Sequence, residues 1–143
     1  MADCKVAFYI IARPTQSAEQ VACILARKAW AQGHRIVVCA PGEEAVRGID
    51  EMMWDQPPGR FLPHETGDRS TAPVLIRHGN TGIPEDRNLV INLCTEPVAD
   101  PGRFKRLCEV VPAQSEQRTA SRDKYRAYRE NSLSLETHEI GKN

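Results

Sequence analysis

The segments VAFYIIA (residues 6–12) and RIVVCA (residues 35–40) are rich in strand-forming side chains; the first is apolar throughout and the second is apolar after Arg35. Shorter, mostly apolar runs occupy residues 73–77, 88–93 and 109–111. A run that is apolar at successive positions, without alternation, predicts a strand buried on both faces, which is the usual environment of a strand in a parallel sheet. We therefore expect a mostly parallel central sheet.

Helical patterns alternate with these runs. Ser17 and Gln20 form a capping-box pair, and Gly33 is placed to end the helix that they begin. Apolar residues recur at helical spacing over residues 45–53, and residues 115–130 predict a final helix. Strands that alternate with helices indicate an α/β fold with helices on both faces of the sheet.

The length of 143 residues suits a single domain. We expect residues 1–131 to form this domain and residues 132–143 to be a loosely held tail. Charged residues make up 27% and hydrophobic residues 41%, which is ordinary for a soluble globular protein. The longest apolar run is far shorter than the roughly 20 residues of a membrane span, and no secretory signal pattern is present. We therefore expect a cytoplasmic protein.

The chain has an odd number of cysteines, and none of them forms a Cys-x-x-Cys pair. A disulfide framework needs paired cysteines and a structural zinc site needs clustered ligands, so we expect neither. We interpret the five cysteines as small buried hydrophobic residues in a reducing compartment. They are Cys4, Cys23, Cys39, Cys94 and Cys108.

The net charge is zero, but the charges are separated along the chain. Residues 43–68 hold seven acidic and two basic side chains, whereas residues 103–129 hold eight basic and three acidic ones. Such a chain offers an acidic face and a basic face to partners. The alternative is that ordinary solvated helix faces give these sums by chance.

The motifs of nucleotide binding and of common hydrolases are missing. The turn after the first predicted strand is Ala-Arg-Pro-Thr (residues 12–15), without the glycines that let a backbone approach a pyrophosphate. His64 and His78 could serve as the base of a small-molecule enzyme, but neither has a partner visible in the sequence. We therefore expect a binding module without catalytic residues, cofactor or metal.

The last predicted helix carries a stripe of functional side chains. At 100° per residue, Arg118, Arg122, Tyr125 and Arg129 fall on one side of this helix. Arginine gives paired donors to carboxylate or phosphate, and tyrosine gives a flat wall. The stripe thus suits an anionic ligand that also carries an apolar or aromatic group.

The opposite side of this helix holds Ala120, Lys124 and Ala127, with Tyr128 at the margin. Small side chains there favour close packing on the sheet, which would turn the stripe outward. Two alternatives remain open: a merely solvated basic helix, and a direct single-stranded nucleic-acid-binding module that uses the same arginines. Electrical neutrality and the lack of a series of aromatic residues for base stacking count against the second.

A second feature is the aromatic and apolar sequence around a Pro-Pro-Gly turn, with Met53 and Trp54 before it and Phe61 and Pro63 after it. These side chains either fold into the core or form an exposed apolar patch for a partner.

Seven segments together resemble the chi-subunit family of bacterial DNA polymerase III over residues 5–130. No single segment is specific, but their order and spacing are. The segments are AFY (7–9), AWAQGHR (29–35), IDEMMW (49–54), FLPH (61–64), APV (72–74), NLVINL (88–93) and RDKYRAYR (122–129).

The resemblance implies a Rossmann-like fold that binds no nucleotide and has no activity of its own. It implies a heterodimer with the psi subunit of the clamp loader. It also implies binding of the acidic, phenylalanine-ended C-terminal tail of single-stranded DNA-binding protein (SSB), so that DNA is contacted only indirectly. The implied tail-binding residues are Val111, Arg118, Arg122, Tyr125 and Arg129. The implied psi-binding residues are Met53, Trp54, Phe61 and Pro63.

Overall fold

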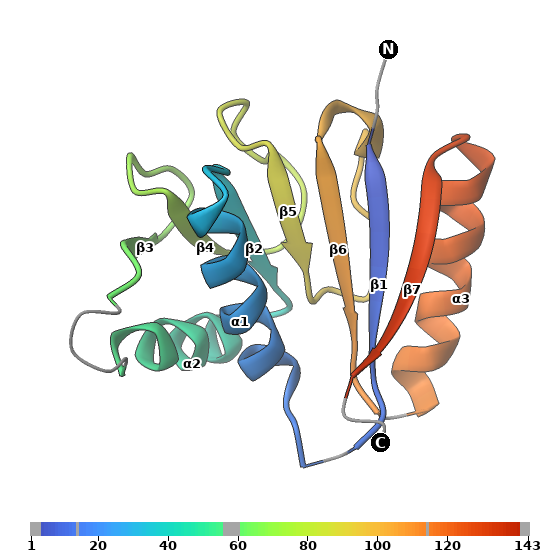
Figure 1. Ribbon diagram of the computed structural model, residues 1–143, viewed down its shortest axis with the longest axis horizontal. Helices are drawn as coiled ribbons and strands as arrows, with labels where there is room; N and C mark the ends of the chain where they lie inside the picture. Colours follow the sequence, from blue (N-terminus) through green and yellow to red (C-terminus); the bar gives the residue numbers. More distant parts are fainter. Residues whose placement is uncertain (1–3, 14, 56–60, 114, 141–143) are drawn as a thin grey trace.

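The computed structural model describes residues 4–13, 15–55, 61–113 and 115–140, with only the backbone for residues 115–117 (Figure 1). Within these residues, seven strands form one sheet in the order β3-β4-β2-β5-β6-β1-β7, and every pairing is parallel. The strands are β1 (Lys5–Ile11), β2 (Ile36–Ala40), β3 (His64–Thr66), β4 (Val74–His78), β5 (Leu89–Asn92), β6 (Arg106–Val111) and β7 (Ser134–Ile140). The helices are α1 (Ala18–Ala31), α2 (Glu43–Trp54) and α3 (Ser115–Glu130), with the short 3₁₀ helix η1 (Pro101–Arg103).

Helices cover both faces of the sheet. α1 and α2 lie on one face, and α3 lies on the other face beside β1 and β7 (Figure 1). Each face has its own core because alternate strand residues point to opposite sides. In β1, Ile11 belongs to the core under α1 and α2, whereas Val6 and Phe8 belong to the core under α3. This confirms the predicted α/β architecture and its Rossmann-like character.

The predicted start of α1 is confirmed in detail. The backbone N–H of Gln20 donates to Ser17 Oγ at 3.1 Å, and the backbone N–H of Ser17 donates to Gln20 Oε1 at 2.9 Å. Two amides that the helix leaves unpaired are thereby satisfied. Gly33 follows the helix with φ of +87°, a conformation that favours glycine.

The structure differs from the sequence-based expectation at the C-terminal end. Instead of a loosely held tail, Ser134–Ile140 forms β7, which pairs with β1 along its whole length. The half-buried side chain of Leu135 packs on the core under α3, and that of Ile140 packs on the opposite core. The rings of Tyr9 and His138 also stack, with centroids 5.1 Å apart. Residues 141–143 lie outside the described residues.

Candidate functional site

The orientation of α3 follows from which of its side chains enter the core. Lys124 and Tyr128 are buried against the sheet, whereas Arg122, Tyr125 and Arg129 are exposed. Residues 124 and 128 are one helical turn apart, so their burial fixes the rotation of the helix about its axis. The predicted outward stripe is thereby confirmed at these three positions.

The inward face of α3 is held by a buried polar network. Lys124 Nζ donates to Glu109 Oε1 at 2.8 Å, and the Tyr128 hydroxyl donates to Glu109 Oε2 at 2.5 Å. Asn92 Nδ2 donates to the same Oε2 at 2.8 Å, and Lys124 also donates to the carbonyl of Cys94. Burial raises the pKa of the Glu109 carboxyl, although these donors oppose the shift. The network attaches α3 to β5 and β6.

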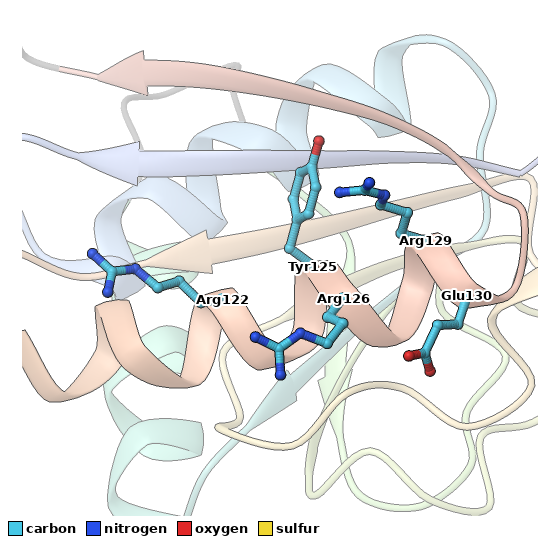
Figure 2. Close-up of a pocket in the computed structure, with 5 residues that line it drawn as sticks. All are labelled: Arg122, Tyr125, Arg126, Arg129 and Glu130. Atoms are coloured by element: carbon cyan, nitrogen blue, oxygen red, sulfur yellow. The ribbon is translucent and has the colours of Figure 1, made fainter.

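The outward face of α3 carries a pocket of about 670 Å³. Figure 2 shows Arg122 and Arg129 on either side of Tyr125, with Arg126 and Glu130 on the opposite flank of the helix. The Tyr125 ring is 37% exposed, and its centroid lies 5.5 Å from that of the buried Phe8. The pocket therefore combines an anchored aromatic wall with guanidinium donors, which suits a carboxylate next to an apolar group.

The structure brings together three of the five residues that the resemblance implied for the tail. Arg118 is exposed one turn before Arg122 but does not line this pocket. Val111 is 3% exposed and packs in the core under α3, so its side chain does not line the pocket. Sequence reasoning missed Arg126, although its spacing of four residues from Arg122 places both on neighbouring turns.

The second candidate surface is an exposed aromatic pair, which we call the aromatic patch: Trp54 and Phe61. Their side chains are 61% and 47% exposed, and their ring centroids lie 5.1 Å apart. Met53 is fully buried under α2, and Pro63 is half-buried. Both alternatives predicted for this segment are found in different parts of it. Met53 folds into the core, whereas Trp54 and Phe61 form the exposed aromatic patch. The turn itself lies outside the described residues.

The two histidines considered as a possible base, His64 and His78, lie in different environments. His64 is buried, with Nδ1 donating to the Leu62 carbonyl at 2.6 Å, whereas His78 is exposed, 3.5 Å from Glu43. Within the described ranges, no group of three or more His, Cys, Asp or Glu is placed to hold a metal ion. Burial raises the pKa of the Cys23 and Cys94 thiols to about 11, which keeps them protonated at neutral pH.

No helix in the described part of the chain is both long enough and apolar enough to cross a membrane.

The family model described as DNA polymerase III chi subunit, HolC, matches residues 4–136. The chain is 35% identical over 138 residues to the DNA polymerase III subunit chi of Pseudomonas aeruginosa, covering 95% of this chain and 96% of that protein. It is 28% identical over 138 residues to the subunit chi of Escherichia coli, covering 91% of this chain and 94% of that protein. The chain therefore belongs to the chi-subunit family of DNA polymerase III, whose members are accessory proteins of DNA replication.

Proposed function

We propose that this chain is a noncatalytic bridging subunit. It connects the clamp loader, through the psi subunit, to the acidic C-terminal tail of SSB. The observation that carries the proposal is the pocket on α3, where Arg122 and Arg129 flank the exposed ring of Tyr125.

The chemistry of the pocket matches a peptide that ends in phenylalanine and carries acidic residues. The Tyr125 ring, supported from behind by Phe8, offers a flat apolar surface to the terminal side chain. The guanidinium groups of Arg122 and Arg129 offer paired donors to the terminal carboxylate and to aspartates. Because few residues form the pocket, we expect a dissociation constant on the order of micromolar.

The positions of the two candidate surfaces support a bridge. α3 lies beside β7 at one edge of the sheet, whereas the end of α2 lies toward β3 at the other edge (Figure 1). The α3 pocket and the aromatic patch therefore lie toward opposite edges of the sheet, which leaves each surface open to a partner of its own. Simultaneous binding is what a bridging subunit requires.

The test is fluorescence polarisation with a labelled acidic peptide that ends in phenylalanine. We expect saturable binding that weakens with salt and is lost in Arg122→Ala. Lys105→Ala removes the same charge from an exposed position before β6 and is the matched control. A peptide without the final phenylalanine, or with an amidated C-terminus, should also fail to bind.

A single-stranded oligonucleotide titrated in parallel separates this function from direct nucleic-acid binding. Weak oligonucleotide binding with clear peptide binding supports the proposal. Tight oligonucleotide binding with no response to the peptide would overturn it and favour the nucleic-acid-binding module. No binding of either the peptide or the oligonucleotide would overturn the assignment of the α3 pocket as a tail-binding site.

A further inference from the structure

One side of the sheet is left open at β1 and β7. On that side α1 packs on β2, β5 and β6, and Figure 1 shows no described helix over β1 and β7. α3 packs on β6 and β7 from the opposite side. Tyr9 of β1 points to the uncovered side, where it borders the core under α1, and its register partner in β7 is His138. We call this uncovered side of β6, β1 and β7 the open face.

Two aromatic rings form a flat surface on the open face. The rings of Tyr9 and His138 are stacked, with centroids 5.1 Å apart and planes 20° apart. The His138 side chain is 46% exposed, and its Nε2 lies 3.0 Å from Glu136 Oε2, which orients the ring. The two rings come from opposite ends of the chain, so no local sequence pattern marks them.

A small cleft of about 130 Å³ adjoins the rings, between α1 and the open face. A cavity of about 150 Å³ holds one benzene-sized molecule, so the cleft admits one small chemical group. The apolar residues that line it are Leu25, Ala29, Leu89 and Cys108. The polar residues that line it are Tyr9, Lys28, Gln32 and Arg106. The Arg106 side chain also donates a hydrogen bond to the Tyr9 hydroxyl, so a guanidinium group lies directly beside the ring surface.

The open face is locally positive, although the net charge of the chain is zero. Exposed Lys5 is the register partner of Arg106, and Lys28 of α1 borders the same cleft as Arg106. Among the described residues of β1, β6 and β7 that point to this side, Glu136 is the only acid. Three cations therefore face one carboxylate, which favours an anionic ligand.

We infer that the open face binds single-stranded nucleic acid weakly and without sequence preference. A base stacks on the rings of Tyr9 and His138, and neighbouring phosphates contact Arg106 and Lys28. Aromatic side chains on an exposed sheet face, with cations beside them, are a common way of binding single strands. A nucleic acid fits better than an acidic peptide because every nucleotide carries both a flat ring and a phosphate. This surface is separate from the α3 pocket, so the inference does not rest on the proposed tail contact.

The experiment is fluorescence polarisation of the full chain with a labelled oligothymidine of about 12 nucleotides, a length within the usual site size of about 4–16. We expect a dissociation constant on the order of 10–100 μM at about 50 mM salt. The test variant is Lys28→Gln with Arg106→Gln. The matched control is Arg47→Gln with Arg69→Gln, which removes two exposed positive charges on other parts of the chain.

The test variant should bind at least about tenfold more weakly, and the control should stay within about twofold of wild type. The salt dependence should also change, because each phosphate contact contributes about 0.7 to the slope of log K against log salt for a single strand. Loss of two contacts should therefore reduce this slope by about 1.4.

Variants of His138 test the stacking. His138→Ala should weaken oligothymidine binding at least about fivefold, whereas His138→Phe, which keeps a ring, should bind within about twofold of wild type. His78→Ala, at an exposed histidine of β4, is the control. A duplex of the same length hides the faces of its bases and should bind more weakly than the single strand.

Urea unfolding checks that the variants remain folded. The inference is overturned if wild type does not bind the single strand, if it binds the duplex equally well, or if the test variant binds like wild type. Loss of oligothymidine binding in Arg122→Ala would also overturn it, by placing the nucleic acid on α3. Loss of binding to the acidic peptide in the Lys28 and Arg106 variant would instead assign the open face to the peptide. Failure of this inference alone leaves peptide binding by the α3 pocket unchanged.

Discussion

Lys124 Nζ lies 2.8 Å from Glu109 Oε1, and both side chains are shielded from solvent. The pair joins α3 to the middle of β6. Because Lys124 precedes Tyr125, the burial of Lys124 directs Tyr125 outward into the pocket. A buried ion pair thus orients a surface that is itself exposed.

Removing one partner of this pair should destabilise the fold strongly. Lys124→Met leaves the Glu109 carboxylate buried without its cation, and we expect a loss of about 3–5 kcal/mol in the free energy of unfolding. Urea unfolding followed by circular dichroism measures this loss. Arg126→Met, an exposed change on the same helix, is the control and should shift stability by no more than about 0.5 kcal/mol.

The double variant Glu109→Leu with Lys124→Met checks the cause. It replaces both charges by apolar groups, so much of the lost stability should return. A double variant as unstable as Lys124→Met alone would show that lost packing, and not the unpaired charge, is responsible.

The same carboxyl makes stability depend on pH. Burial raises the pKa of Glu109 above its unfolded value, so between these two values the native state binds more protons than the unfolded state. Stability from this group therefore falls as pH rises through that window and recovers as pH falls. Relative to Glu109→Gln, the wild type should gain stability as pH is lowered from 7 toward 5. Parallel pH dependences of the two proteins would contradict this.

The sequence predicts well those features that depend on neighbours in the chain. The apolar run in β1 and the cap at Ser17 and Gln20 are local patterns, and both predictions are confirmed. The helical wheel also places Lys124 on the inward side of α3. Its partner Glu109 was not foreseen, because a pair 15 residues apart is created by packing and not by spacing.

Two further features, the strand β7 and the position of Val111 relative to the α3 pocket, could not be predicted because no local pattern in the sequence marks them. In β7, Leu135 and Ile140 face opposite sides of the sheet and the residues between them are polar, so no alternation of apolar residues marks the strand. Val111 was assigned to the tail site by resemblance. Its burial agrees with the strand predicted over residues 109–111, but its position relative to the α3 pocket depends on how α3 packs on β6, which sequence spacing does not report.

The packing of β7 gives a direct test of the C-terminal segment. Leu135→Ala removes a half-buried side chain from the core under α3, and we expect a loss of about 1–2 kcal/mol in the free energy of unfolding. Ser134→Ala, an exposed neighbour, should stay within about 0.5 kcal/mol of wild type. Equal stability of both variants and wild type would indicate a loosely held tail after all.

A variant of Arg126 distinguishes direct contact with the peptide from long-range electrostatic attraction at the α3 pocket. Figure 2 shows its side chain on the flank away from Tyr125, so it should attract an acidic peptide through solvent without holding the terminal carboxylate. We expect Arg126→Ala to weaken peptide binding about two- to fivefold at low salt, with little effect at 0.5 M salt. Arg122→Ala should cost more than tenfold and keep much of its effect at high salt, because a direct bidentate contact is lost. A larger loss for Arg126→Ala than for Arg122→Ala would instead place the peptide on the flank that Arg126 shares with Glu130.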